Sequence, residues 1–234
     1  PGELRQRARR LELNVFNVCG ADGRPIAGSY GDRERAVPVG EDPVLRRALA
    51  GETNAGVVLL AAGRLDLEGG VALRNAVAIP AVSREDSAHA GEALFLWAAV
   101  PLPGPDGTIG GVAYGGRALN LNHAIVDELR DLVFGTASYA GKPLGTTTVF
   151  LRDMRIATNV LQPDRRRAVG TVVSAEVRRS VLELGQRWND RALVVDAWYQ
   201  SAYKPLLDPD GTPVGMLYAG LLEAPYVDAS RRFS

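Results

Sequence analysis

Residues 101–116 read PLPGPDGTIGGVAYGG, and residues 205–220 read PLLDPDGTPVGMLYAG, so nine of sixteen positions are identical at an offset of 104. In both copies the proline presets φ for the first corner of a turn, and the glycine takes the left-handed position that closes a hairpin. Strand length and composition are shared by the four flanking runs, 95–102, 109–116, 198–206 and 214–222. Asp-Gly hairpins also recur in unrelated α+β proteins, but the shared Pro-Leu and Tyr-x-Gly flanks exceed what turn chemistry requires. The sequence therefore predicts a structural repeat.

Weaker echoes of the same order lie upstream of both hairpins. Residues 15–26 and 149–157 each have the pattern of a hairpin around a short polar turn. Each is followed by a helical pattern that ends near a glycine, at 44–51 and 177–185. Each half thus reads hairpin, helix, strand and hairpin, which predicts an α+β protein of two tandem lobes. In each lobe we expect an antiparallel sheet of about five strands with helices packed on one face, the plan of PAS-like domains.

A helix is predicted between the two halves. Apolar residues recur at helical spacing over residues 120–134, with an asparagine available as N-cap and Gly135 placed as a C-terminal stop. We expect residues 1–118 to form a long N-terminal helix and the first lobe, 119–135 the connecting helix, and 136–234 the second lobe. The Arg-rich start of the sequence suggests a piece of a longer protein whose flanking membrane helices are not included.

Composition and charge narrow the class of protein. The 234 residues contain 27 Lys+Arg and 27 Asp+Glu, and this zero net charge argues against a nucleic-acid partner. The single cysteine, Cys19, excludes an internal disulfide and a cysteine-rich metal site. The longest strongly apolar stretch, residues 93–102, is well short of the roughly 18 residues that cross a bilayer.

The motifs of catalysis and cofactor binding are missing from the sequence. His89 and His123 are the only histidines, and their separation lacks the spacing of a metal-binding helix. No Gly-x-Ser-x-Gly elbow occurs, and no Lys-Ser/Thr pair follows the glycines of residues 110–116 to form a phosphate loop. We therefore predict no catalytic residue, no metal and no cofactor. An enzyme on a PAS-like scaffold remains the alternative, and it requires a convergent acid–base pair.

Candidate binding residues cluster in the second half. Tyr199, Ser201 and Tyr203 share one face of the predicted strand, because side chains alternate along a strand. Facing the helices, they would either line a small pocket or fill the core. An arginine offers a bidentate fork for a carboxylate, and the segment 165–171 is expected to fold over the same face. The predicted ligand-binding residues are Trp198, Tyr199, Tyr203, Arg167, Arg191 and Lys204, with Arg84, Trp97 and Tyr114 as weaker candidates in the first half.

Five motifs carry a resemblance to a known family. They are residues 145–150 (GTTTVF), 155–160 (RIATNV), 167–171 (RAVGT) and 198–205 (WYQSAYKP), followed by 215–221 (GMLYAGL). In this order they resemble the Cache superfamily of sensor domains, and most closely its double-Cache type that fuses a Cache-3 and a Cache-2 lobe. The resemblance covers about 80 residues and extends to the first half through the internal repeat.

The resemblance implies a function and an assembly. Such domains lie outside the bacterial cytoplasmic membrane between two membrane helices, and they serve chemotaxis transducers or sensor histidine kinases. We accordingly expect the periplasmic part of a methyl-accepting chemotaxis transducer that binds an acetate-like organic anion, with a histidine-kinase sensor as the alternative. The family usually has an acidic residue where this sequence has Lys204, and the exchange favours an anionic ligand. The full receptor is expected to be a homodimer paired through its N-terminal helices.

Overall fold

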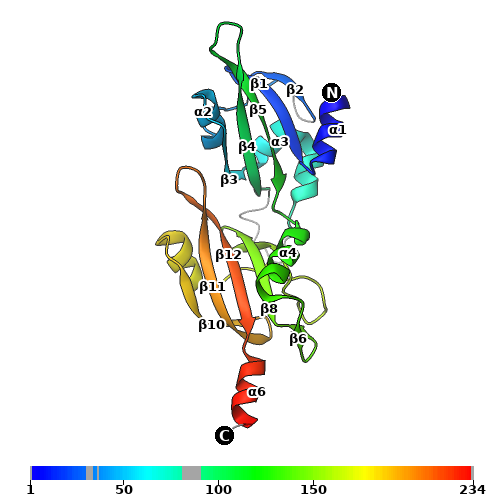
Figure 1. The fold of residues 1–234 in the computed structure, drawn as a ribbon, viewed down its shortest axis with the longest axis vertical. Helices are drawn as coiled ribbons and strands as arrows, with labels where there is room; N and C mark the ends of the chain where they lie inside the picture. The colour runs from blue at the N-terminus through cyan, green and yellow to red at the C-terminus, as the bar shows by residue number, and fades with distance from the viewer. Residues whose placement is uncertain (1, 30–33, 36, 81–90, 233–234) are drawn as a thin grey trace. The chain divides into compact units, whose positions relative to one another are not determined.

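The computed structural model describes residues 2–29, 34–35, 37–80 and 91–232, which form two compact units (Figure 1). The first unit holds the described residues within Pro1–Ala78, His89–Asn120 and Leu207–Thr212. The second holds those within Ile79–Ala88, Leu121–Leu206 and Pro213–Ser234. Each unit has its own hydrophobic core. This arrangement agrees with the two lobes that the repeat predicts.

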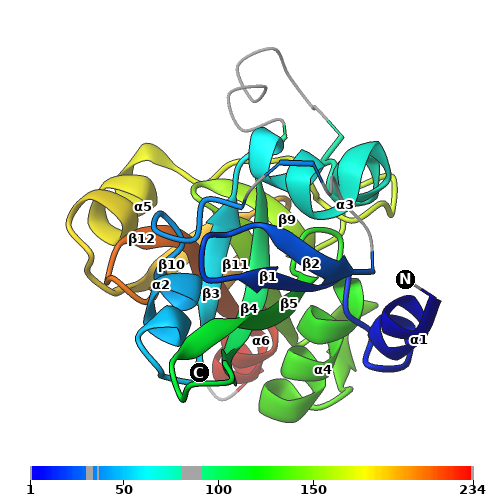
Figure 2. The ribbon, with the colours of Figure 1, turned by 90° about the horizontal axis from the view of Figure 1, so that it is seen from above.

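The first unit is built on a five-stranded antiparallel sheet in the order β2-β1-β5-β4-β3. Its strands are β1 (Val15–Gly20), β2 (Pro25–Gly28), β3 (Asn54–Leu60), β4 (Ala93–Pro103) and β5 (Ile109–Ala118). Its helices are α1 (Gly2–Arg10), α2 (Pro43–Leu49) and α3 (Ala62–Val77). Helix α2 packs on β3, β4 and β5, and α1 packs beside β1 and β2 (Figure 2).

Local sequence explains the start of α2 and the burial of β4. The Asp42 carboxylate accepts hydrogen bonds from the backbone N–H groups of Val44 and Leu45, and Pro43 occupies the first helical turn. Along β4, alternate residues turn into the core, so that Phe95 and Trp97 are buried against each other with their ring centroids 5.6 Å apart. Val44 and Leu45 belong to the same core cluster as Phe95 and Trp97, and this cluster joins α2 to the sheet.

The second unit is built on a five-stranded sheet in the order β10-β11-β12-β8-β9. Its strands are β8 (Gly145–Leu151), β9 (Met154–Thr158), β10 (Trp188–Val194), β11 (Ala197–Leu207) and β12 (Pro213–Leu222), and β6 (Ser138–Tyr139) and β7 (Lys142–Pro143) form a separate small hairpin. Its helical segments are α4 (His123–Phe134), α5 (Ala175–Arg178), the π-helical turn η2 (Arg179–Glu183) and α6 (Ala224–Arg232).

Helices cover both faces of β8, the first strand of this sheet. The Thr147 hydroxyl donates to the backbone carbonyl of Val126 in α4. Phe150, three residues further along β8, belongs instead to the core cluster that contains Val177 of α5 and Val181 of η2. We call the face covered by α5 and η2 the inner face. The expectation of helices on one face therefore describes only part of this unit.

Both sheets have the same topology. Written from the second strand of each unit, β2-β1-β5-β4-β3 corresponds strand by strand to β9-β8-β12-β11-β10. The two Asp-Gly hairpins, β4–β5 and β11–β12, occupy equivalent positions, as the repeat predicts. Their turn glycines, Gly107 at φ +81° and Gly211 at φ +86°, take the left-handed conformation that glycine adopts without strain.

Three features differ from the expectations. The connecting helix begins at His123, because Asn120 is buried in the first unit and uses its side chain there. The described part of the N-terminal helix, α1, spans nine residues, so the long helix stays a prediction. Helix α3 was not expected at all, and it lies within the segment of residues 61–92 that separates β3 from β4.

The side chain of Asn120 supports a testable prediction about the fold. Its Oδ1 accepts from the backbone N–H of Leu94 at 3.0 Å, and its Nδ2 donates to the carbonyls of Val77 at 2.9 Å and Glu92 at 3.2 Å. Asn120→Ala leaves these backbone groups without their partner, so we expect a loss of about 2–3 kcal/mol in the free energy of unfolding. Urea denaturation measures it. Asn189→Ala, at an exposed position of β10, is the control and should change the value by less than about 0.5 kcal/mol.

Candidate ligand-binding site

The second unit contains a cavity of about 410 Å³ at its inner face. The cavity lies beside β10 and β11, beneath the segment that leads into α5. Its polar lining comes from Arg155, Thr171, Ser174, Glu176, Trp188, Arg191 and Tyr203, and of its two arginines Arg191 is paired with Glu223. A cavity of this size accepts a small metabolite, and its lining combines aromatic rings with a few polar groups, as ligand sites commonly do.

Arg155 supplies the positive charge of this cavity. The residue is only 7% exposed, and its guanidinium lies 5.2 Å from the centroid of the Phe150 ring. Nη1 donates to the Thr171 hydroxyl, whereas Nε is buried and has no hydrogen-bond partner among the described residues. The backbone is fixed as well, since the N–H of Arg155 donates to the Thr171 carbonyl at 2.8 Å. The guanidinium is thus held in place with part of its donor capacity unused.

A β-bulge turns Arg155 toward the inner face. Val149 pairs with Ala157, but the next residue of β8, Phe150, pairs with Arg155, so that Ile156 is an extra residue in β9. Such a bulge shifts the alternation of side chains by one position. Arg155 therefore shares the face of Phe150 and enters the core.

The charge of Arg155 is not balanced by a carboxylate. Among the residues that the structure describes, none forms an ion pair with it, and Glu176 at the cavity accepts from Trp188 Nε1 at 2.9 Å. Burial lowers the pKa of Arg155, and the same burial raises the pKa of Tyr203 and Tyr218 beside it. An unpaired ion inside a protein costs several kcal/mol. The cavity therefore favours a ligand that is an anion.

The structure divides the predicted strand residues between two faces. Tyr199 and Tyr203 are buried in the inner-face cluster, and burial raises the pKa of Tyr199 to about 12. Trp198 and Lys204 alternate with them and are exposed on the opposite face. Of these four residues, Tyr203 lines the inner cavity. A single pocket cannot collect all of them.

The two predicted arginines are already paired. Arg167 forms a bidentate ion pair with Asp127, at 2.9 Å for Nη1–Oδ1 and 2.7 Å for Nη2–Oδ2, and also donates to the Thr158 carbonyl. Arg191 donates from Nε to Glu223 at 2.6 Å and stacks on the Trp198 ring at 4.1 Å. Both charges are satisfied within the protein, so neither arginine needs an anionic ligand.

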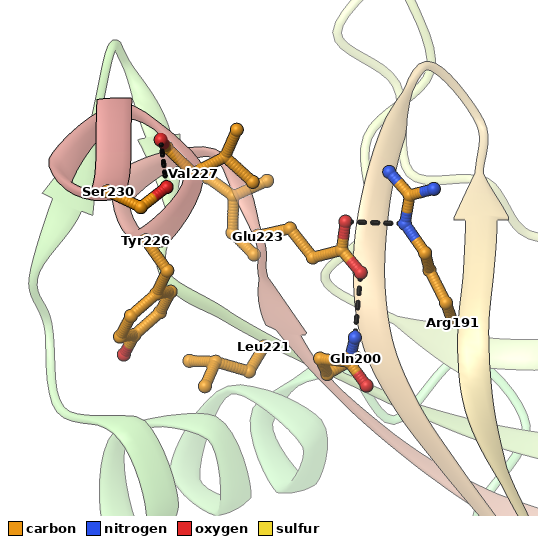
Figure 3. Close-up of a pocket in the computed structure, with 8 residues that line it drawn as sticks. Arg191, Gln200, Leu221, Glu223, Tyr226, Val227 and Ser230 are labelled. Atoms are coloured by element: carbon orange, nitrogen blue, oxygen red, sulfur yellow. Dashed lines mark hydrogen bonds and ion pairs between the residues drawn. The ribbon is translucent and has the colours of Figure 1, made fainter. Parts of the chain in front are cut away.

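A second cavity, of about 620 Å³, lies on the opposite face at the start of α6 (Figure 3). Glu223 is its central charged group: Oε2 accepts from Arg191, and Oε1 accepts from Gln200 at 2.8 Å. Tyr226 and Val227 of α6 complete the wall shown in Figure 3. Because the carboxylate is paired, this cavity has no unmatched charge that would select an ion.

Two of the three weaker candidates, Trp97 and Tyr114, are buried in the first unit. Trp97 is 1% exposed, and Tyr114 is buried and donates from its hydroxyl to Glu68 at 3.0 Å. Arg84 lies outside the described residues. The sequence reasoning missed Arg155 and Glu68, although Arg155 opens one of the motifs, residues 155–160, that carry the family resemblance.

Comparison with protein families supports the Cache resemblance for the second half. Residues 117–232 match the family described as single Cache domain 3. This region contains α4, the second sheet and α6. The fusion of a Cache-3 and a Cache-2 lobe is not matched and stays a prediction. No curated protein matches the sequence.

Solved structures with some similarity are sensor domains. The sensor domain of the histidine kinase DctB from Vibrio cholerae is 12% identical, with 94% of this chain and 76% of that chain covered and a TM-score of 0.46. The periplasmic domain of Vibrio cholerae LuxQ is 12% identical, at 95% and 78% coverage and a TM-score of 0.48. The ligand-binding domain of the Pseudomonas fluorescens chemoreceptor CtaA, in complex with L-serine, is 10% identical, at 95% and 78% coverage and a TM-score of 0.44. At TM-scores below 0.5, these likenesses say nothing about the ligand of this chain.

The described residues contain neither a membrane-spanning helix nor a cluster of metal-binding side chains. Within the described ranges, no helix has the length and apolar character that crossing a membrane requires. The same part of the chain contains no group of three or more His, Cys, Asp and Glu side chains arranged to hold a metal ion.

The unbalanced charge of Arg155 leads to a prediction about stability. In Arg155→Met an apolar side chain of similar length replaces a buried, unpaired ion, so we expect the free energy of unfolding without ligand to rise by about 1–2 kcal/mol. Chemical denaturation in a buffer free of carboxylates measures it. Arg166→Met removes an exposed arginine of the same unit and should stay within about 0.5 kcal/mol of the parent. A loss of 2 kcal/mol or more in Arg155→Met would mean that the arginine serves the fold.

Proposed function

We propose that this chain is the ligand-binding part of an extracytoplasmic bacterial sensor and that its second unit binds a small organic anion of acetate-like size. The observation that carries the proposal is the buried, unpaired guanidinium of Arg155 beside a cavity of about 410 Å³. The match of residues 117–232 to a Cache family supports a sensor. The enzyme alternative requires a convergent acid–base pair, and Glu176 at the cavity is tied to Trp188 instead.

The donor geometry favours a carboxylate. Nη1 of Arg155 donates to Thr171, whereas its buried Nε has no hydrogen-bond partner among the described residues. Two parallel N–H groups on one edge of a guanidinium match the two oxygens of a carboxylate. Tyr203 lines the same cavity and adds a hydroxyl donor. The buried rings around them exclude water and strengthen these bonds.

The size of the ligand limits the affinity that can be expected. The best small ligands reach about 1.5 kcal/mol per heavy atom, so the four heavy atoms of acetate give roughly 6 kcal/mol, or tens of micromolar. A longer organic acid would gain from apolar contacts in the rest of the cavity. Affinity should therefore rise from acetate to acids of a few more carbons and then fall when the cavity is full.

The family resemblance supports a proposal for the output of the sensor. We propose a methyl-accepting chemotaxis transducer, located in the cytoplasmic membrane with this chain in the periplasm and paired as a homodimer. A histidine kinase is the alternative output. The sequence encoded after Ser234 distinguishes the two, because a methyl-accepting signalling domain and a kinase domain have different motifs.

Titration calorimetry tests the site. We expect acetate and related acids to bind the parent protein, and Arg155→Met to lose at least tenfold in affinity, because it removes the charge-assisted donor. Tyr203→Phe should weaken binding by a smaller factor, since it removes a neutral donor. Arg166→Met is the matched control for Arg155, and Trp198→Ala tests the opposite face; both should bind as the parent does.

Two results would contradict this site. Unchanged binding of organic acids in Arg155→Met would exclude the arginine. Loss of binding in Trp198→Ala or Lys204→Met, with Arg155→Met unaffected, would move the ligand to the opposite face of the sheet, where the structure places Trp198 and Lys204.

A further inference from the structure

The first unit contains a carboxylate that is bound as a ligand would be. Glu68 of α3 is 0% exposed, and its carboxylate accepts three hydrogen bonds. Arg64 Nε donates to Oε1 at 2.6 Å, while Asn17 Nδ2 at 2.6 Å and the Tyr114 hydroxyl at 3.0 Å donate to Oε2. Burial raises the pKa of Glu68, and the charge of Arg64 and the donors oppose this rise. The group is enclosed, and both of its oxygens accept hydrogen bonds.

The hydroxyl that binds this carboxylate belongs to Tyr114, whose equivalent in the second unit is Tyr218. Tyr114 and Tyr218 are equivalent at the repeat offset of 104 residues. Each lies in the last strand of its sheet and pairs with the first strand, opposite Asn17 and Thr148, respectively. In the second unit the charge of Arg155 acts on Tyr218, and no carboxylate arrives there from the described residues. The two equivalent tyrosines thus have different neighbours. The hydroxyl of Tyr114 binds the carboxylate of Glu68, whereas Tyr218 lies near the unpaired guanidinium of Arg155.

The element that delivers Glu68 is an insertion. Residues 61–92 separate β3 from β4, whereas only Val195 and Asp196 separate the equivalent strands β10 and β11. Helix α3 lies within this insertion, and Gly70 at φ +64° interrupts it two residues after Glu68. Arg64 and Glu68 are therefore carried together on the short first piece of α3, four residues apart on one side.

The donors around Glu68 are themselves held in place. Arg64 also donates to Asp42 Oδ2 at 3.3 Å, and that carboxylate caps α2 through its other oxygen. Asn17 Oδ1 accepts from the backbone N–H of Ser29 at 3.2 Å, which leaves its amide nitrogen facing Glu68. The donor set is thus fixed by contacts other than Glu68 and should keep its geometry when the glutamate side chain is shortened.

We infer that the first unit has a carboxylate-binding site, formed by Arg64, Asn17 and Tyr114, which Glu68 occupies as a ligand tethered to the protein. The unit is consequently closed to free organic acids, and shortening Glu68 opens it to acetate. The chemistry sets the choice of probe: Glu68→Ala removes the γ-carbon and the carboxyl group, which together are the heavy atoms of acetate. This inference concerns the first unit and does not depend on the proposed function of the second.

The experiment compares two variants with an identical second unit. Glu68→Ala empties the site, whereas Glu68→Gln keeps it filled with a side chain of the same shape. We expect acetate at ten times its dissociation constant to raise the Tm of Glu68→Ala by about 3–6 °C more than that of Glu68→Gln. Chloride at the same ionic strength and methylammonium, a cation of similar size, should produce no such difference. Adding Tyr114→Phe to Glu68→Ala should weaken acetate binding about tenfold.

Each outcome decides the inference. If Glu68→Ala does not fold alone, acetate but not chloride should restore its near-UV circular dichroism, and failure to do so counts against the site. A folded Glu68→Ala without an acetate effect, or an equal effect in Glu68→Gln, would overturn it. Arg155→Met, added to both variants, removes the proposed site of the second unit. If acetate binding to the second unit is then lost while the Glu68→Ala effect is retained, the result supports both sites.

Discussion

A guanidinium buried without a carboxylate is the constraint around which the second unit is organised. Arg155 is lodged between Phe150 and the segment at Thr171, where it is largely buried and no acidic side chain of the described residues forms an ion pair with it. Tyrosine hydroxyls and a threonine reduce the cost of this burial without cancelling the charge. The remaining imbalance is what gives the adjoining cavity a preference for anions, so instability without ligand and affinity for a ligand have the same physical origin.

The first unit solves the same electrostatic problem internally. There the positive charge of Arg64 is met by Glu68 and Asp42 of the same unit, and two of the three donors to Glu68, Arg64 and Asn17, are each held by a further contact. The sheets have equal topology, yet the inserted α3 fills one of them, while the short β10–β11 connection leaves the other accessible. In our proposal, this difference in connection length separates a closed first unit from a second unit that binds a ligand.

The sequence predicts the two sheets better than it predicts the residues of the candidate binding site. The Asp-Gly hairpins have strong local signals, because turn chemistry and strand alternation act over a few residues. The inward direction of the Arg155 side chain depends on a β-bulge at Ile156. One extra residue exchanges inward-facing for outward-facing side chains, and the sequence shows no pattern that predicts it. Arg167 is one of the two arginines that the sequence predicts as ligand residues, but its partner Asp127 is 40 residues away in α4. Pairings over such distances follow from packing, which local sequence does not encode.

The edge strand β10 connects the inner cavity with the C-terminal helix. Arg191 lines that cavity from one side and holds Glu223 on the other, and Glu223 immediately precedes α6. The backbone N–H of Glu223 also donates to the Trp198 carbonyl at 3.0 Å, so the start of α6 is bound to both β10 and β11. An edge strand has a neighbour on one side only and is the part of a sheet that shifts at least cost. A ligand that draws β10 toward Arg155 would therefore pull on α6 through an ion pair and a backbone hydrogen bond, which are short and directional enough to transmit small displacements.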